Sequence, residues 1–245
     1  MSQQQGQQSA PQPGQQQGAP RVVVLDVNET LSDLSPLDDA FVEVGLGAHE
    51  RQAWFAGVLR DGFGLGLAGA SAAFADVASG ALRVRLLESG TPAEEVEQKV
   101  ETVMGRFSTL RVHPDVPPGI RALRAAGLRI VTLTNGSTSV AEGLLERAGL
   151  RDHLDLLLSV EDAPAWKPAA SAYEHALEEC GVEAHEAMLV AVHPWDIDGA
   201  ARAGLRTGWV DRSGRGAYPA YLRAPELSAP SLAELAGDLL TAELK

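Results

Sequence analysis

The sequence is poor in cysteine, in aromatic residues and in positive charge. Its one cysteine, Cys180, excludes an internal disulfide, and the helical pattern around it is typical of a packing residue. Lysine and arginine number 20 against 33 acidic residues, and the net charge of −13 disfavours a nucleic-acid or anionic membrane surface. No apolar run is long enough to span a bilayer, and no basic and then apolar segment marks a signal peptide. We therefore expect a cytoplasmic protein that binds neither nucleic acid nor membrane.

Composition divides the 245 residues into three parts. Residues 1–20 are almost entirely Gln, Gly, Pro, Ser and Ala, which predicts disorder. Residues 35–110 carry apolar residues at helical spacing and no convincing buried strand, so we expect an inserted helical cap there. Residues 21–34 and 111–245 are predicted to form one core, because short buried strands alternate with helices along them.

Within the predicted cap, two local signals are specific. Thr91 is followed by a proline and then, at the third position, by Glu94, which predicts an N-terminal helix cap at Thr91. The glycines of residues 62–66 are expected to break or loosen a helix.

The core pattern predicts an α/β fold with a doubly wound parallel sheet. Strands are expected over residues 22–25, 128–134, 154–160, 187–192 and 206–210. Helices are expected over residues 114–126, 137–148, 168–180 and 196–203, with a last one from residue 230. Because the insertion follows the first strand directly, the predicted cap should lie near the carboxyl end of that strand.

Polar residues follow the ends of these strands, where open α/β sheets bind their ligands. Asp26 ends the first strand, and Thr134 with Asn135 ends the second. Lys167 lies at the mouth of a later helix, with Pro168 expected at its first position, and Asp196 follows the fourth strand. A lysine there opposes the helix dipole, so we interpret it as a cation that holds Asp26 ionised. The plain alternatives are turn and helix caps for Asp26 and Thr134, and a solvated surface lysine.

The stretch Asp26-Val27-Asn28-Glu29-Thr30-Leu31 resembles the first motif of the haloacid dehalogenase superfamily. Together with the other strand-end residues, this motif makes the chain resemble the superfamily over residues 21–210. The resemblance implies a HAD-like Rossmannoid core with Asp26 as nucleophile. The superfamily's phosphatases usually carry a general acid at the position of Asn28, so its replacement points away from phosphate-ester hydrolysis. Metal-dependent members present two acids in the last motif, whereas here Val192 replaces the earlier one and only Asp196 remains, so we expect no tightly bound metal and no cofactor.

The pattern further resembles the type II, L-2-haloacid dehalogenases, through Lys167-Pro168 followed by Tyr173 and through Trp195-Asp196. That family displaces halide from C2 of a short halogenated carboxylic acid, and water then hydrolyses the aspartyl ester. By resemblance, Asp196 with Lys167 orients this water. The remaining predicted roles are positioning of the nucleophile by Thr30, Thr134 and Lys167, and contact with substrate or halide by Asn28, Phe55, Thr134, Asn135, Tyr173, His193 and Trp195. The resemblance also suggests a homodimer.

The sequence departs from that family at several site positions. The family's halide-binding arginine follows a tryptophan, whereas here Phe55 follows Trp54. Arg60 is a substitute only if its helix turns it inward. A tyrosine and a glycine of the first motif become Asn28 and Glu29. In the last motif a serine and an asparagine become Ala191 and His193; the histidine, if protonated, can donate to a halide or carboxylate, or it makes a structural hydrogen bond.

Two other functions remain open on the sequence. The first is a Mg²⁺-dependent phosphatase of the same superfamily, which needs ligands that the motifs lack. The second is a non-catalytic binding protein on the same fold, which the altered last motif favours and the joint retention of Asp26, Lys167 and Asp196 opposes.

Overall fold

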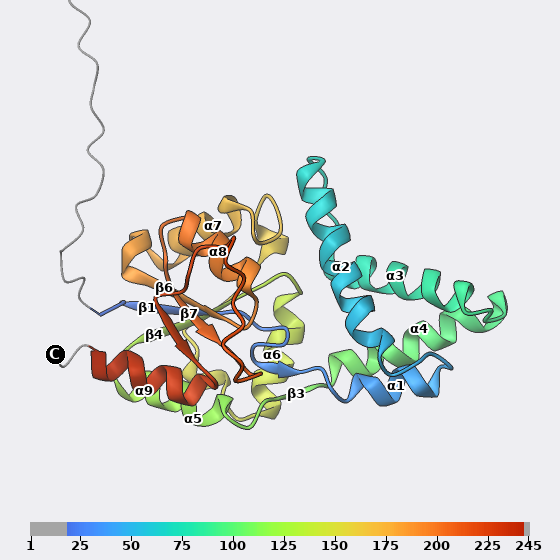
Figure 1. Ribbon diagram of the computed structural model, residues 1–245, viewed down its shortest axis with the longest axis horizontal. Helices are drawn as coiled ribbons and strands as arrows, with labels where there is room; N and C mark the ends of the chain where they lie inside the picture. Colours follow the sequence, from blue (N-terminus) through green and yellow to red (C-terminus); the bar gives the residue numbers. More distant parts are fainter. Residues whose placement is uncertain (1–18, 243–245) are drawn as a thin grey trace, which may run out of the picture.

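The fold is built on a six-stranded parallel sheet, seen in a computed structural model that describes residues 19–242 (Figure 1). The strand order is β5-β4-β1-β6-β7-β8. The strands are β1 (Val22–Leu25), β4 (Arg129–Thr134), β5 (Leu156–Ser159), β6 (Ala187–Ala191), β7 (Arg206–Val210) and β8 (Leu227–Ala229). The predicted disorder of residues 1–20 falls almost entirely outside the described residues.

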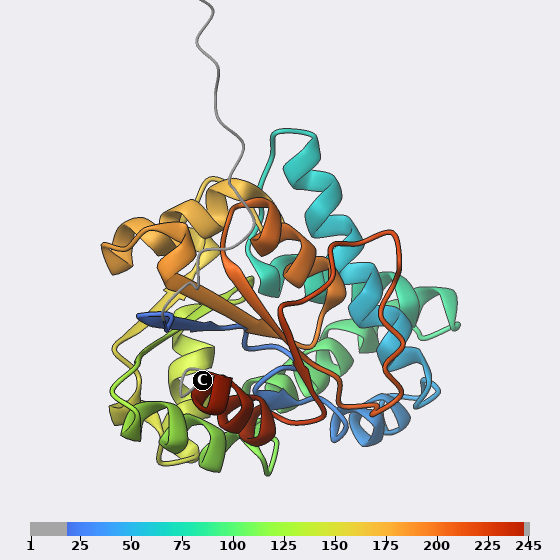
Figure 2. The same ribbon diagram turned by 60° about the vertical axis from the view of Figure 1, so that its left-hand side comes forward.

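The central strand β1 is buried on both faces, which explains its unbroken apolar run. Val22 and Val24 join one hydrophobic cluster, and Val23 and Leu25 join the other. Helices α7 and α8 cover the first face, and α5, α6 and α9 cover the second (Figure 2). These helices are α5 (Val116–Ala125), α6 (Thr138–Arg147), α7 (Ala170–Cys180), α8 (Pro194–Arg202) and α9 (Leu232–Ala242). The predicted doubly wound α/β fold is therefore confirmed.

A separate layer of four helices stands beside this core (Figure 1). It contains α1 (Leu37–Glu43), α2 (Glu50–Leu67), α3 (Phe74–Glu88) and α4 (Ala93–Ser108). The chain leaves the core at β2 (Ser32–Asp33) and returns at β3 (Arg111–Val112), and these two short strands pair antiparallel. Side chains of this helical layer, α1–α4, belong to the same hydrophobic cluster as one face of the sheet. The layer is therefore packed onto the core.

Two local predictions for the helical layer are wrong. Helix α2 runs unbroken through residues 62–66, because packing of its apolar face outweighs the low helix propensity of glycine. Gly62 has a packing role: a Cβ there would lie 2.2 Å from the Trp166 ring. At α4 the capping residue is Pro92, and no side chain bonds to the free backbone N–H groups, so Thr91 is not the cap.

Element boundaries in the core differ slightly from the predicted ones. Helix α7 begins at Ala170, so Pro168 lies before the helix and not at its first position. Helix α8 begins earlier than predicted, at Pro194, a residue suited to a first turn. The edge strand β8 was not predicted, because three residues with one buried side chain carry little periodic signal.

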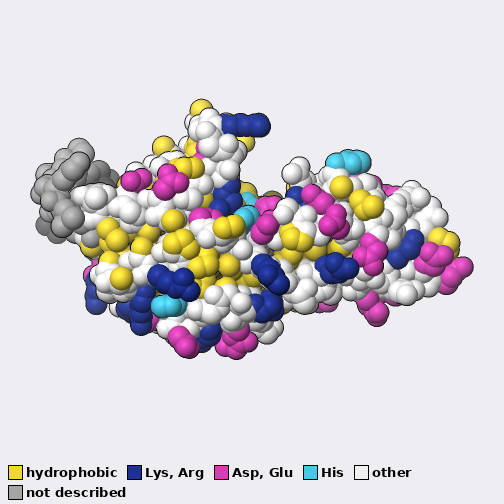
Figure 3. Space-filling view, turned by 90° about the horizontal axis from the view of Figure 1, so that it is seen from below, with side chains coloured by type: hydrophobic (Ala, Val, Ile, Leu, Met, Phe, Trp, Pro, Cys, Tyr) yellow, Lys and Arg dark blue, Asp and Glu magenta, His cyan; other side chains and the backbone are white. Residues whose placement is uncertain are grey.

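The surface carries the acidic excess without a broad patch of one sign on the face that Figure 3 shows, where basic and acidic side chains are interspersed. Within residues 19–242, no helix combines the length and apolar character that crossing a membrane requires. Cys180 is buried in α7, in agreement with a packing role.

Candidate active site

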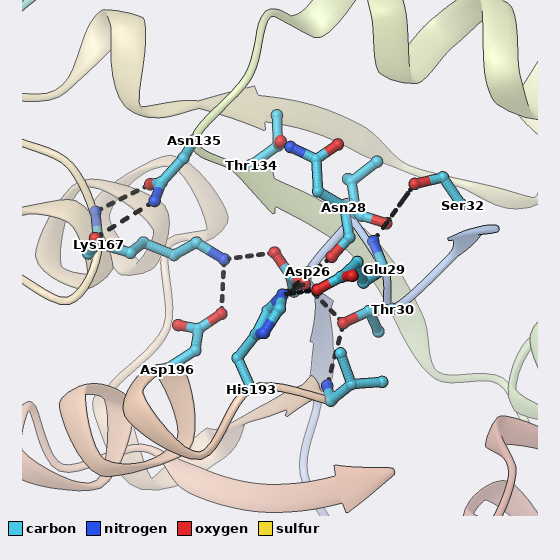
Figure 4. A network of polar contacts seen from close by, with 12 residues as sticks. Asp26, Asn28, Glu29, Thr30, Ser32, Thr134, Asn135, Lys167, His193 and Asp196 are labelled. Atoms are coloured by element: carbon cyan, nitrogen blue, oxygen red, sulfur yellow. Dashed lines mark hydrogen bonds and ion pairs between the residues drawn. The ribbon is translucent and has the colours of Figure 1, made fainter. Parts of the chain in front are cut away.

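The candidate site is centred on a buried lysine between two carboxylates (Figure 4). Lys167 Nζ donates to Asp26 Oδ1 at 2.9 Å and to Asp196 Oδ2 at 2.6 Å. Its side chain is 0% exposed, so the alternative of a solvated surface lysine is wrong. A buried ammonium needs such partners, because its desolvation is otherwise unfavourable by several kcal/mol. These three residues are called the charged triad below.

The charged triad also shapes proton affinities. Burial acts to lower the pKa of Lys167, but the carboxylates of Asp196 and Asp26 outweigh it and raise that pKa above 10.5. Burial raises the pKa of Asp196, against the attraction of Lys167. Tyr173 donates to Asp196 Oδ1 at 2.6 Å, and burial beside that carboxylate raises the pKa of Tyr173 well above 10. The lysine therefore stays charged and the tyrosine stays a donor at neutral pH.

Thr30 fixes the other oxygen of Asp26. Its Oγ1 donates to Asp26 Oδ2 at 2.5 Å and accepts the backbone N–H of Val192 at 3.0 Å. Because the Thr30 oxygen accepts the Val192 N–H, the hydroxyl donates its own proton to the Asp26 carboxylate. Asp26 thus receives one donor on each oxygen, at the end of β1, and is held in a single orientation.

Asn135 acts on the backbone of the triad lysine. It donates from Nδ2 to the Lys167 carbonyl at 3.2 Å and accepts the Lys167 N–H at Oδ1 at 2.9 Å. Thr134 accepts the N–H of Gly136 at 3.0 Å, which orders the turn between β4 and α6. Ser137 accepts the N–H of Val140 and caps α6, so part of this turn does serve as the predicted helix cap.

The ring of His193 lies beside the Asp26 carboxylate (Figure 4). Its Nε2 is 3.1 Å from the Asn28 carbonyl oxygen and 3.9 Å from Asp26 Oδ2. Its ring is flanked by Phe55 at 6.3 Å and by Trp195 at 5.1 Å between centroids. The structure therefore brings His193, Phe55 and Trp195 together beside the nucleophile candidate. The expected structural hydrogen bond is also present.

Glu29 lies in the site, although it was not among the predicted site residues. Its Oε2 lies 3.8 Å from His193 Nε2, and its Oε1 lies 3.7 Å from Arg51. Burial raises the pKa of Glu29, while His193 and Arg51 oppose the rise. Its φ of 64° lies in the left-handed region that favours glycine. The replacement of a family glycine by glutamate was the signal that could have identified it.

Neither Arg60, the expected substitute for the family's arginine, nor its neighbour Arg51 is paired with Asp26. The Arg60 side chain is 77% exposed and pairs with its neighbour Asp61, so it is not turned inward. Arg51 is buried, but it pairs with Asp38 and reaches Glu29 at 3.7 Å. The position after Trp54 holds the buried ring of Phe55.

The side chains of the charged triad are poorly suited to binding a metal ion. Each carboxylate that could ligate a cation is bonded to the Lys167 ammonium, which already balances charge there. Over residues 19–242, no cluster of three or more His, Cys, Asp or Glu side chains is placed to hold a metal ion. The predictions of no metal and no cofactor stay predictions.

Comparison with known proteins identifies the family. A model of the haloacid dehalogenase-like hydrolase family matches residues 20–204. The chain belongs to this family. It is 32% identical over 124 residues to haloacetate dehalogenase H-2 of Moraxella sp. (strain B), covering 51% of the chain and 55% of that enzyme. It is 26% identical over 221 residues to an (S)-2-haloacid dehalogenase of Pseudomonas putida, covering 89% and 96% of the two chains.

A solved dehalogenase of the family has the same fold. The L-2-haloacid dehalogenase from Xanthobacter autotrophicus, with chloropropionic acid covalently bound, aligns with a TM-score of 0.79 at 25% identity. The alignment covers 92% of this chain and 99% of that enzyme, whereas the match to the Moraxella enzyme spans about half of its length. The predicted resemblance to 2-haloacid dehalogenases is confirmed at the level of family and fold.

Proposed function

We propose that this family member hydrolyses the carbon–halogen bond of short 2-haloalkanoic acids. The observation that carries the proposal is the Asp26 carboxylate, oriented by Thr30 and held beside the buried ammonium of Lys167. The ammonium of Lys167 balances the charge of this carboxylate without a metal, and the carboxylate is the form of aspartate that can attack carbon. Membership of the family and the relatives' printed activities support the same reaction.

In the first step an oxygen of Asp26 attacks C2 of the acid. A C–O bond forms, the carbon–halogen bond breaks, and the halide leaves with the bonding electron pair. Two donors already hold the Asp26 carboxylate, so its orientation for attack from the face opposite the halogen needs no rearrangement. His193, whose Nε2 donates to the Asn28 carbonyl at 3.1 Å and lies 3.9 Å from Asp26, is proposed to line the substrate site with its ring.

In the second step water attacks the carbonyl carbon of the Asp26 ester. The acyl C–O bond breaks, the 2-hydroxy acid leaves after taking up a proton, and the Asp26 carboxylate is restored with net release of one proton. Asp196 accepts one hydrogen bond on each oxygen, from Lys167 and from Tyr173, and each oxygen keeps a lone pair for water. We propose that Asp196 with Lys167 orients this water.

The proposal also covers the role of the helical layer, the oligomeric state and the location in the cell. The helical layer α1–α4 is proposed to act as the cap over the site, since Phe55 and Phe74 from it lie near His193 and Trp166. A homodimer and a cytoplasmic location are proposed from the family resemblance. Light scattering of the purified protein tests the homodimer, and a mass of about 25.8 kDa would exclude it.

The test is halide release measured by ion chromatography with EDTA present. Chloroacetate and both enantiomers of 2-chloropropanoate serve as substrates, and Asp26→Asn serves as the matched inactive variant. The proposal predicts halide release by the native protein only. Phosphate release from a general phosphate ester that depends on added Mg²⁺, with no halide release, would favour a phosphatase instead. No turnover of either substrate class would favour the non-catalytic binding protein.

A further inference from the structure

An arginine outside the charged triad is bonded to the backbone of Thr30, the residue whose hydroxyl orients Asp26. Arg212 follows the end of β7 by two positions, and its Nη2 donates to the Thr30 carbonyl oxygen at 2.6 Å. A hydrogen bond this short is typical of a donor that carries a full charge. A cation from a segment 182 positions away therefore holds the turn that follows the nucleophile candidate.

The peptide groups on both sides of the Thr30 Cα are held by hydrogen bonds. Before Thr30, the carbonyl oxygen of Glu29 accepts from His113 Nε2 at 3.1 Å. After Thr30, its own carbonyl accepts from Arg212, and the N–H of Leu31 donates within the turn at 2.9 Å. Since each peptide group is planar, fixing both of them fixes the direction of the Cα–Cβ bond of Thr30. The backbone therefore helps to determine where the Thr30 hydroxyl points.

Arg212 is itself anchored to the core. Its Nη1 donates to Asp115 Oδ1 at 2.8 Å, and Asp115 Oδ2 accepts the N–H of Leu232, the first residue of α9, at 2.7 Å. The side chains of Arg212 and Asp115 are only 22% and 18% exposed, so most of this pair is withdrawn from water. The planar guanidinium directs one N–H to Asp115 and another to Thr30 in a fixed geometry, which a flexible ammonium does less well.

A second arginine–aspartate pair in the core has the same anchoring contacts without the contact to the site. Arg124 Nη1 donates to both oxygens of Asp155 at 3.0 and 3.1 Å, and Asp155 accepts the N–H of Ile130 at 2.8 Å. Both of these bonds from Arg124 go to its aspartate, whereas Arg212 divides its donors between an aspartate and Thr30. Anchoring of the core therefore accounts for the bond to Asp115 and leaves the bond to Thr30 to be explained.

We propose that Arg212 is a positioning residue of the dehalogenation, which acts through Thr30 to keep the Asp26 carboxylate in its attacking orientation. This inference rests on the proposed function and adds to it a residue that is assigned no contact with the substrate. Displacement of reacting groups by about 1 Å can slow a reaction by about 10²-fold. Loss of Arg212 should therefore lower kcat and leave KM nearly unchanged, because the contacts that bind the acid stay in place.

A double-mutant cycle with Thr30 tests whether Arg212 acts through that residue. Arg212→Met alone should lower kcat for 2-chloropropanoate about tenfold or more, with KM within about twofold of the native value. In the Thr30→Val protein, assayed at raised enzyme concentration, the same change should lower kcat less than about twofold, because the hydroxyl is already absent. Losses that multiply in the double variant, or a native kcat for Arg212→Met, would overturn the proposal.

Two further variants separate positioning from stability. Arg124→Met is the matched control, since it breaks an equivalent pair with an aspartate that holds a backbone N–H, and it should keep the native kcat. An equal loss of kcat in Arg124→Met would assign the effect to the general stability of the core and overturn the proposal. Arg212→Lys keeps a cation beside Asp115, and the cycle is run with it if Arg212→Met does not fold. Its smaller loss of kcat should likewise disappear in the Thr30→Val protein.

Amide hydrogen exchange tests the assignment without turnover. The N–H of Val192 donates to Thr30 Oγ1 at 3.0 Å, so its exchange rate reports the placement of that hydroxyl. Measured by NMR relative to the amide of Leu189 in β6, this rate should rise about tenfold in Arg212→Met and stay native in Arg124→Met. Such a rise in a protein that releases no halide would support the positioning role and place the failure in the proposed reaction. An unchanged Val192 exchange rate in Arg212→Met would overturn the positioning role and leave dehalogenation standing.

Discussion

The two sides of the site carry different kinds of side chain. The core side carries charged residues that hydrogen bonds hold in place, and the helical-layer side carries aromatic rings. The core places Asp26, Lys167 and Asp196 at the ends of strands and fixes each by hydrogen bonds of 2.5–2.9 Å. The helical layer contributes the rings of Phe55 and Phe74, which pack against His193 and Trp166 of the core. This difference separates the charged side chains of the proposed reaction, which the core supplies, from the aromatic rings that the helical layer supplies.

The largest expected effect follows from removing the nucleophile. Asp26→Asn should lower kcat/KM for 2-chloropropanoate by at least about 10³-fold, because no other described carboxylate is oriented by both Lys167 and Thr30. Ion chromatography of released halide measures this. Circular dichroism should show a folded protein, since the amide keeps the shape of the side chain. Retention of a tenth or more of the native rate would remove Asp26 from the mechanism.

The second effect concerns the stability of the core side. Lys167→Met should lower the free energy of unfolding by about 3 kcal/mol or more, since it leaves two buried carboxylates without their cation. Urea unfolding at neutral pH measures the difference. Lys99→Met, at a partly exposed pair with Glu95 in α4, is the matched control and should change stability by less than about 1 kcal/mol.

The same lysine predicts a pH dependence. Although burial opposes it, Asp196 and Asp26 raise the pKa of Lys167 above 10.5, so its contribution to stability is complete below that pH. The contribution should be lost as pH rises through the folded-state pKa. The stability difference between native protein and Lys167→Met should therefore stay level up to pH 10.5 and shrink above it. A difference that shrinks already between neutral pH and pH 9 would contradict the ion-pair account.

A smaller effect is expected at His193, a core residue that packs against the helical layer. His193→Asn removes a ring packed between Phe55 and Trp195 but keeps a donor near Asp26. We expect a loss of roughly tenfold in kcat/KM, equivalent to one hydrogen bond and its packing. Steady-state kinetics on 2-chloropropanoate measures it. A loss as large as that of Asp26→Asn would assign His193 a direct part in bond breaking.

The smallest expected effect is that of Glu29→Gly, which should raise stability and lower activity. Glu29→Gly relieves the left-handed φ of 64° and should raise the free energy of unfolding by about 1 kcal/mol. It should lower activity a few-fold, because the carboxylate beside His193 is lost. Glu29→Gln keeps the backbone strain and the side-chain shape, so it should lower activity without raising stability. Urea unfolding and halide release on both variants separate the two effects.

The core side was predictable from sequence because its signals are local. Asp26, Asn135 and Lys167 each come after a strand of a parallel sheet, and such strands end at one edge. The opposition of Lys167 to the helix dipole already indicated a partner, and the structure supplies two. The hydrogen bonds of Asn135 to the Lys167 backbone carry no sequence signal, since they join residues that are 32 positions apart.

The helical-layer side was less predictable because its contacts depend on long-range packing. Helix α2 has no room for a Cβ at Gly62, because that Cβ would lie 2.2 Å from the ring of Trp166, which comes from the core. The stacking of Phe55 on His193 joins residues that lie 138 positions apart by number, and helical periodicity cannot pair them. The backbone φ of Glu29 likewise follows from the turn after β1 and not from the residue type.

The most direct test of the account is transfer of oxygen from solvent to Asp26. The protein would turn over 2-chloropropanoate for many cycles in ¹⁸O-water with EDTA present, and mass spectrometry would weigh the peptide containing Asp26. An aspartyl ester opened at its acyl carbon predicts ¹⁸O in the Asp26 carboxylate. Halide release with ¹⁸O in the product hydroxyl and none in Asp26 would show direct attack by water and contradict the account.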